Sequence, residues 1–159
     1  FTEGNRPILF SEFARNIDGA VAVPAVGRDR VRAFYWNTGP YVELSAPGGD
    51  QRKHGTEGGI VQQTYDQGFV DTFSLGPARF RPPRFDVFVY DFYQGTSMAV
   101  PHVSGFAAQV YEQGGTWPAA TEAIMNHYAT DLGAPGSDNE YGEGLINPRA
   151  ALRGMGLIR

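Results

Sequence analysis

Cysteine is absent from this sequence of 159 residues. That absence excludes a disulfide framework, a thiol nucleophile and a cysteine metal site, although it does not fix the compartment. Long hydrophobic runs are absent too, because no apolar run approaches the ~18 residues that a membrane-spanning helix needs. Positive charge is scarce. The chain has 13 Lys and Arg against 17 Asp and Glu, and the net charge of -4 argues against a nucleic-acid binder.

The residues that are present suit a folded domain with many turns. Hydrophobic residues make up 42%, which is enough for a packed core and too many for a disordered tail. The 21 glycines predict many tight turns. The length fits one domain or a large part of one. No signal peptide is visible and the chain opens at Phe1 without an initiator methionine, so we expect a fragment or a processed product.

The hydrophobic pattern predicts strands first and helices last. The expected strands cover 19–26, 31–36, 41–45 and 87–94. Between them we expect a polar surface loop over 50–59, a hairpin that pairs 60–65 with 70–73, and an exposed connection over 76–84. The expected helices run from the region of Gly95 to 113, from Thr116 as N-cap to about Tyr128, and from Asn147 as N-cap to about Arg153. A turn-rich loop is expected over 131–144.

A hydroxyl group stands where an expected strand gives way to an expected helix. Ser97 lies there, at the start of the stretch Gly95–Gly105, with Pro101 expected in about the first helical turn. Helix N-termini carry unpaired backbone N–H groups, and the helix dipole favours negative charge there. A serine hydroxyl is a weak nucleophile that needs an adjacent base, usually a histidine oriented by a carboxylate. An isolated Gly-Thr-Ser would more often mean only that Thr96 or Ser97 caps the helix.

The whole stretch resembles the nucleophile motif of the subtilisin-like serine proteases, or subtilases. The match consists of Gly-Thr-Ser-Met-Ala at 95–99 and Pro-His-Val at 101–103, with Ser104 where alanine is commoner. Further segments resemble the family in the same order along the chain, namely 20–26, 37–40, 44–48, 131–133 and 141–147. The resemblance implies an α/β fold, the C-terminal part of a subtilisin-like three-layer fold with a mainly parallel sheet. It also implies that 1–159 is the C-terminal portion of one catalytic domain, with the N-terminal portion absent.

For function, the resemblance implies a secreted serine endopeptidase that hydrolyses peptide bonds through an acyl-enzyme on Ser97. Asn5 is the implied side-chain donor of the oxyanion hole, and the Ser97 N–H is the second donor. Such donors stabilise the negative charge that develops on the carbonyl oxygen. Glu3 stands where the family has a small residue, and Gly-Asn is also a common turn, so a simple turn at Asn5 stays an alternative.

The partners of the nucleophile are missing from the expected places. Subtilases carry their aspartate and histidine before the serine, so both should precede Asn5. Of the three histidines, His102 is expected to pack or hydrogen bond on the serine helix, His54 to be solvated, and His127 to lie near a helix end. The isolated chain should therefore be inactive unless an upstream chain supplies His and Asp. The rival interpretations are a non-catalytic subtilase-like binding or assembly module, and an anion-binding helix N-terminus.

Other partners follow from the resemblance. We expect a peptide or protein substrate, no nucleic acid, no membrane and no cofactor. The family often binds calcium, but no EF-hand-like spacing supports a site at Asp50, Asp138 and Glu140. Glu12 falls near the implied pocket for the residue before the scissile bond, although a solvated surface charge is the favoured interpretation. Five aromatic residues either wall a cleft or cover a satellite core, with the second favoured, namely Tyr65, Phe69, Phe73, Tyr90 and Tyr93.

Overall fold

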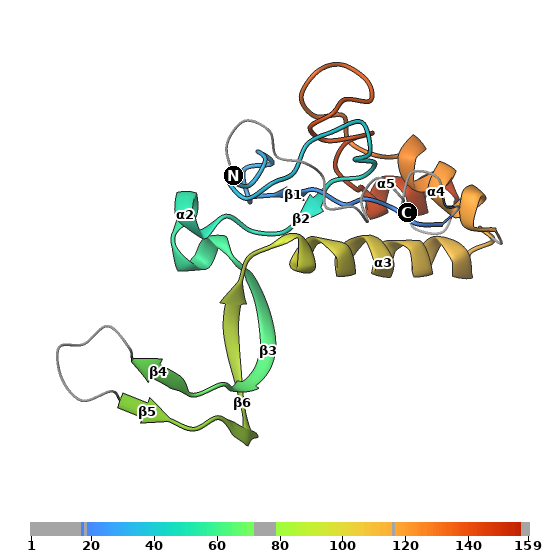
Figure 1. Ribbon diagram of the computed structural model, residues 1–159. Coiled ribbons are helices and arrows are strands. Elements are labelled where there is room, and N and C mark those ends of the chain that lie inside the picture. Colours follow the sequence, from blue (N-terminus) through green and yellow to red (C-terminus); the bar gives the residue numbers. More distant parts are fainter. Residues whose placement is uncertain (1–16, 18, 72–78, 116, 157–159) are drawn as a thin grey trace.

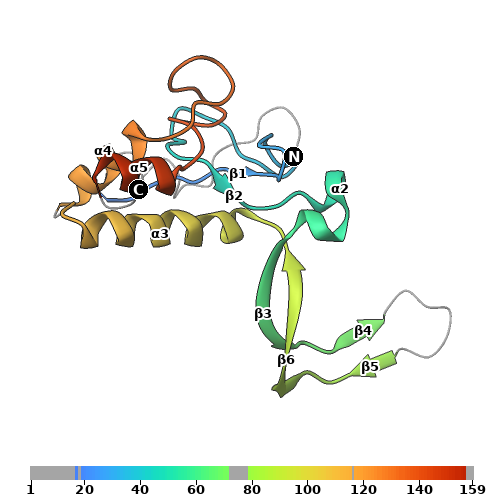
Figure 2. The ribbon, with the colours of Figure 1, turned by 180° about the vertical axis from the view of Figure 1, so that it is seen from behind.

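Two parts of the molecule meet at the start of one helix. The computed structural model describes residues 17, 19–71, 79–115 and 117–156, with the backbone alone for 69–71 and 79–80. The β-arm, residues 60–71 and 79–93, is a bent antiparallel ribbon, and the other described residues form the helical body (Figure 1). Seen from behind, the arm again stands clear of the body (Figure 2).

The parallel part of the sheet is small. Strand β1 (Ala25–Val26) pairs with β2 (Ala46–Pro47) in parallel, and Ala25 lies opposite Ala46. The strand expected over 19–26 is therefore limited to its last two residues, because Pro24 has no N–H to donate to a ladder and the regular pairing begins after it. The expected strand over 31–36 is wrong, since its residues form turns with one isolated bridge between Val26 and Arg32.

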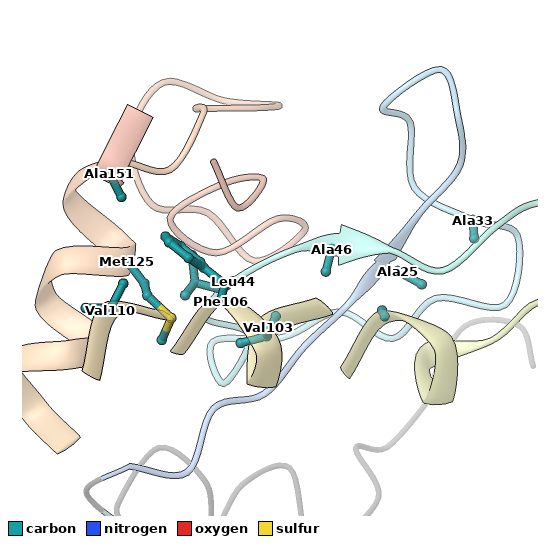
Figure 3. Packing of buried hydrophobic residues seen from close by; sticks show 10 residues of the cluster. Ala25, Ala33, Leu44, Ala46, Val103, Phe106, Val110, Met125 and Ala151 are labelled. Atoms are coloured by element: carbon teal, nitrogen blue, oxygen red, sulfur yellow. The ribbon is translucent and has the colours of Figure 1, made fainter. Parts of the chain in front are cut away.

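Helix α3 (Thr96–Glu112) organises the core of the body. Its buried residues are Ala99, Val103, Phe106 and Val110, which recur every three or four positions and so share one face of the helix. That face packs against side chains from the strands and from the other helices (Figure 3). The rest of the buried cluster consists of Ala25, Ala33, Leu44, Ala46, Met125 and Ala151.

Two shorter helices complete the body. Helix α4 (Pro118–His127) has Trp117 as its N-cap, so the prediction of Thr116 as N-cap is wrong, and Thr116 itself lies outside the described residues. Helix α5 (Pro148–Gly154) begins as predicted, because the Asn147 Oδ1 accepts a hydrogen bond from the Ala150 N–H at 3.0 Å. The turn-rich connection expected over 131–144 is confirmed.

The arm differs from the predicted hairpin. Strand β3 (Ile60–Asp66) pairs antiparallel with β6 (Arg84–Tyr93), and β4 (Phe69–Asp71) pairs with β5 (Arg79–Arg81). The expected pairing of 60–65 with 70–73, like the expected connection over 76–84, is therefore wrong. Alternating side chains identify a strand but not its partner, which here follows some twenty residues later in the chain.

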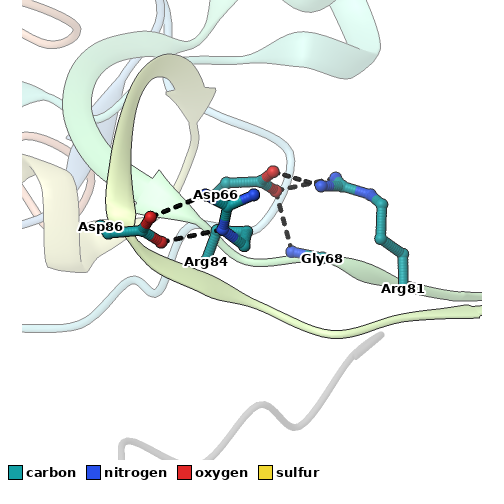
Figure 4. Close-up of polar contacts among 5 residues, drawn as sticks. All are labelled: Asp66, Gly68, Arg81, Arg84 and Asp86. Carbon is teal, nitrogen blue, oxygen red and sulfur yellow. Dashed lines mark hydrogen bonds and ion pairs between the residues drawn. The ribbon is translucent and has the colours of Figure 1, made fainter.

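A bend separates the two ladders of the arm (Figure 1), and Figure 4 shows the polar contacts beside it. Gly68 has φ +69°, and a Cβ there would collide with the Arg81 carbonyl oxygen, so the bend requires glycine. The Asp66 carboxylate accepts a hydrogen bond from the Gly68 N–H at 3.0 Å and pairs with the Arg81 guanidinium through both oxygens. The ion pair thus spans the bend from one strand to the other.

The segment between body and arm is more regular than predicted. Instead of a surface loop over 50–59, it forms helix α2 (Gln51–His54) and the 3₁₀ turn η1 (Thr56–Gly58). Asp50 caps α2 by accepting a hydrogen bond from the Lys53 N–H at 3.0 Å.

The fold class is thus α/β as predicted, and the described strands form one small parallel sheet (β1–β2) and two antiparallel sheets (β3–β6 and β4–β5). In the described part of the chain the antiparallel ladders of the arm hold more paired residues than the single parallel pair. None of the described helices is both long and apolar enough to span a membrane.

Candidate functional site

Ser97 is the second residue of α3, and its side chain is exposed. Strand β6 ends at Tyr93, and the chain turns into the helix through Gln94 and Gly95. Gly95 has φ +150°, a conformation that other residues rarely adopt. Its carbonyl oxygen accepts hydrogen bonds from the N–H groups of Met98, at 3.0 Å, and Ala99, at 3.3 Å. The glycine therefore allows a sharp turn that presents the serine hydroxyl at the helix N-terminus, as the sequence predicts.

The first N–H groups of α3 are available at its N-terminus. The N–H groups of Met98 and Ala99 are paired with Gly95, whereas those of Thr96 and Ser97 come too early in the helix to have a helical partner. Among the described residues no side chain caps this end. These donors and the helix dipole favour a negative charge beside the Ser97 hydroxyl.

The Gly95 turn rests directly on Gly48, which follows strand β2. The Gly95 N–H donates a hydrogen bond to the Gly48 carbonyl oxygen at 2.9 Å. A methyl group at Gly48 would lie 2.5 Å from the Ala25 Cβ and 2.7 Å from the Gly95 carbonyl oxygen. Only glycine allows this approach, so Gly48 lets the Gly95 turn lie directly against the parallel strands.

The Tyr35 hydroxyl also hydrogen bonds to the backbone at Gly48 and Gly49. It lies 2.6 Å from the Gly49 carbonyl oxygen and 2.8 Å from that of Gly48, so one proton is shared between two acceptors. Burial of the ring, with a smaller contribution from the charge of Asp50, raises the pKa of Tyr35 to about 12. The phenol therefore stays protonated and keeps its donor role across the physiological pH range.

The residue before Gly95 is anchored to α2. The Gln94 Oε1 accepts a hydrogen bond from the Gln51 N–H at 2.6 Å, and the Gln51 Nε2 donates to the Phe92 carbonyl oxygen at 3.1 Å. These two bonds hold the end of β6 against the α2 turn. Sequence reasoning missed Gly48, Tyr35 and this glutamine pair as positioning residues, because each acts across a long separation in the chain.

Pro101 lies deeper in α3 than predicted. The helix begins at Thr96, which places Pro101 in the second turn rather than the first. Proline has no N–H, so the Ser97 carbonyl oxygen, four residues earlier, receives no helical hydrogen bond from it.

The three histidines have partners other than the serine. The Nδ1 of exposed His102 lies 2.8 Å from the Met98 carbonyl oxygen, which confirms the predicted hydrogen-bonding role. His54 is less solvated than expected, with its Nε2 buried 3.4 Å from an Asp29 carboxylate oxygen. His127 ends α4 as predicted, and its ring contacts Tyr128 edge-on. In the part of the chain that the structure describes, no histidine hydrogen bonds to Ser97.

Several other predicted residues find different settings. Asn5 and Glu12 lie outside the described residues, so neither is placed beside Ser97. The favoured satellite core under the aromatic residues is wrong for Tyr65 and Tyr90, which are exposed. The side chains of Phe69 and Phe73 are not among those described.

The carboxylates suggested for calcium do not share a site. Asp50 caps α2, and Glu140 pairs with Arg32. Burial alone would raise the pKa of Asp138, but hydrogen bonds from the Tyr141, Glu140 and Ala134 N–H groups outweigh it and lower that pKa. Within the described ranges no three acidic or histidine side chains gather as a metal site.

An apolar groove runs along the side of α3. It has a volume of about 540 Å³ and lies between α3, α4 and the extended segment 19–23. Val100 and Tyr111, two large apolar side chains of α3, line it and remain exposed. The helix that carries Ser97 therefore has one covered face and one exposed face.

Comparison with known proteins places this geometry among serine proteases. The sequence profile described as "Subtilase family" matches residues 11–144. Subtilisin BL of Lederbergia lenta is 31% identical over 150 residues, which cover 94% of this chain and 44% of that protein. A protein named "Extracellular serine protease" from Serratia marcescens is 34% identical over 118 residues, which cover 70% of this chain and 10% of that protein.

The solved structures agree in fold. The structure of a protease from Pseudoalteromonas arctica matches with a TM-score of 0.68 and 29% identity, covering 88% of this chain and 37% of that one. The chain thus spans less than half the length of the relatives it matches.

Proposed function

The chain belongs to the subtilase family, and we propose that it carries the nucleophile and the oxyanion hole of a serine endopeptidase. The observation that supports this most strongly is the exposed Ser97 hydroxyl at the N-terminus of α3, which no side chain of the described residues caps. A hydroxyl beside the N–H donors of a helix N-terminus is the arrangement that acyl transfer needs, because the attacking oxygen and the developing oxyanion are bonded to the same carbonyl carbon.

In the proposed reaction the Ser97 oxygen attacks the carbonyl carbon of a peptide bond and gives its proton to a base. The negative charge on the carbonyl oxygen is stabilised by the Ser97 N–H and by the Asn5 side chain. Collapse of the tetrahedral intermediate releases the amine, which takes the proton, and leaves an acyl-enzyme on Ser97. Water then hydrolyses the ester. Gly48 and Tyr35 act by holding the turn that carries the hydroxyl.

The base and its carboxylate come, in this proposal, from an upstream chain that covers the groove beside α3. Two observations and one general property of sheets support this proposal. The groove is apolar and open on the helix that carries Ser97. Parallel strands are normally covered on both faces, and sheets usually have more than two strands. The relatives are also more than twice as long as the part of them that this chain matches.

Labelling with a fluorophosphonate probe tests this proposal, because the probe reacts with an activated serine. The chain alone should label no more than its Ser97→Ala variant. Produced together with the upstream sequence of its source gene, it should label at Ser97, and the labelling should disappear in Ser97→Ala. Strong labelling of Ser97 in the chain alone would contradict the proposal that the base comes from an upstream chain.

A non-catalytic subtilase-like module for binding or assembly is the second candidate. It is favoured by the lack of a histidine hydrogen bond to Ser97 among the described residues. No labelling even with the upstream sequence present would support it.

The name of the Serratia relative also leads us to propose that the protein acts outside the cell.

A further inference from the structure

The β-arm carries an unusual amount of exposed apolar surface. Phe85 and Phe88 are each 70% exposed, Tyr90 is 75% exposed, and Val61 and Tyr65 add 56% and 39%. We call these five residues the aromatic face. They belong to β3 and β6, and β6 leads through Gln94 into the Gly95 turn before Ser97.

Strand register brings these side chains together. Tyr65 lies opposite Phe88. On the same side of the ladder, Tyr90 lies two positions from Phe88, opposite Gln63, and Val61 lies four positions from Tyr65. Residues directly opposite in an antiparallel pair point to the same face. Phe85 joins them through the bulge in β6, because its ring contacts that of Tyr65 at a centroid distance of 4.8 Å.

The size of the aromatic face calls for a partner. Side chains of this kind offer about 150–250 Å² each, so at these exposures the five leave on the order of 600 Å² open. The largest apolar patch on a typical monomer is about 300–600 Å² and is often functional. Dimers of standard size bury about 800 Å² per partner, so face-to-face pairing of two copies would be undersized.

Charge narrows the class of partner further. Arg81 pairs with Asp66, and Arg84 pairs with Asp86, beside the aromatic face (Figure 4). Both of these arginines have an acidic partner, and residues 60–93 hold four aspartates against three arginines, so the arm offers no surplus of positive charge. Anionic membranes and nucleic acids are recognised through such a surplus. A neutral apolar polypeptide fits the surface better than either.

We propose that the aromatic face binds an extended, apolar segment of the polypeptide substrate. The proposal rests on the proposed function, because it gives the substrate of Ser97 a second point of contact. Successive side chains on one face of an extended chain are about 6.8 Å apart, so alternate residues of the segment match the spacing of Phe88 and Tyr90 along β6. Among the described residues no third strand pairs with β3 or β6, so the outer edges of both strands are available there to an added strand.

The position of the arm connects this contact to the nucleophile. Strand β6 leads through Gln94 and Gly95 into α3, and Tyr90 lies about 14 Å along the strand from Gln94 at 3.4 Å per residue. A bound segment would therefore lie about five residues or more from the scissile bond. Its contacts select substrates with an unfolded apolar stretch at that distance.

Binding is best measured without turnover, on the full chain with Ser97→Ala. The probe is a fluorescein-labelled peptide in which phenylalanine alternates with threonine, flanked by equal numbers of lysine and glutamate. The control peptide has serine in place of phenylalanine. Fluorescence anisotropy should show binding of the first peptide only, and Phe88→Ser/Tyr90→Ser should weaken it at least tenfold. Tyr111→Ser/Trp117→Ser, which removes two exposed aromatic side chains from the body, should leave it within twofold.

Three results would overturn the proposal. The first is equal peptide binding by the arm variant and the parent. The second is a dimer of the parent, seen by light scattering, that becomes a monomer in the arm variant. The third is binding of the parent to neutral phosphatidylcholine vesicles that the arm variant loses. Phe88→Tyr/Tyr90→Phe should keep the affinity, which separates loss of the aromatic face from misfolding. None of these results depends on hydrolysis, so failure here leaves the proposed role of Ser97 intact.

Discussion

The helical body and the β-arm use the same residue type in opposite ways. Phe106 of α3 is 2% exposed and packs in the core, whereas Phe88 of β6 is 70% exposed on the arm. Burial of a phenylalanine stabilises a fold by about 1.5–3 kcal/mol, and an exposed ring contributes little. Burial in the body therefore stabilises the fold, whereas the apolar side chains of the arm stay exposed to water and contribute little to stability.

The two regions also differ in how they are held. The body is fixed by packing and by glycine contacts such as Gly48 against Gly95. The arm is a two-stranded ribbon held by its ladder and by surface ion pairs. Two-stranded ribbons are marginally stable alone, and exposed ion pairs add little. Ser97, the proposed nucleophile, thus lies between a rigid body and an arm that can adapt to a ligand.

The largest expected effect compares one substitution in both regions. Phe106→Ala leaves a cavity in the core and should lower the free energy of unfolding by about 3–5 kcal/mol. Phe88→Ala removes an exposed ring and should change it by about 0.5 kcal/mol or less. Urea denaturation of the two variants measures both values. Similar costs would mean that the arm is packed in solution and that the comparison is wrong.

Local patterns identified the part of the site that is continuous in the chain. The run from Gly95 to Pro101 contains a helix start, a glycine turn and a hydroxyl, and the structure places Ser97 at the N-terminus of α3. The buried stripe of α3 has the periodicity that sequence reasoning uses. Asn147 likewise predicted the start of α5 as its N-cap, because capping depends on residues only three positions apart.

Long-range contacts explain the errors. The pattern of β3 is that of a strand, but the pattern does not contain the choice of β6 over β4 as its partner. The role of Gly48 depends on the approach of Gly95 from far along the chain. Strand partners and close approaches are set by the packing of the whole fold, which a single sequence displays only indirectly.

A smaller effect is expected from Gly48→Ala, which tests the contact between Gly48 and the Gly95 turn that precedes Ser97. The new methyl group would press on Ala25 and on the Gly95 carbonyl oxygen, so the turn must shift, at a cost of about 1–3 kcal/mol. Gly105→Ala is the matched control. It lies in α3 with open space around it and should stabilise the chain by about 0.5–1 kcal/mol. Thermal unfolding of both variants checks the contrast, and a neutral Gly48→Ala would show that the turn is not fixed from below.

The smallest expected effect is a change of NMR shift with pH. It is measured at one amide of the arm and compared with one amide of the body. The hydrogen bond from Arg81 lowers the pKa of Asp66 to about 2. An aspartate in an unfolded chain has a pKa of about 3.9. The ion pair therefore stabilises the bend fully above pH ~4, and its contribution is lost as the pH falls through 2. The Gly68 N–H donates to Asp66, so its NMR shift should titrate with a midpoint near 2.

Asp66→Asn should abolish that titration and leave the Val31 amide unchanged. Val31 donates to Asp29 in the body, whose pKa is also lowered to about 2, chiefly by its hydrogen bond with Lys53. A Gly68 midpoint near 4 would mean that Arg81 does not hold Asp66 in solution. In that case the bend rests on the glycine geometry alone. If Asp66→Asn also moved the Val31 signal, the arm and the body would respond as one unit, and the division between a stabilising body and an adaptable arm would not hold.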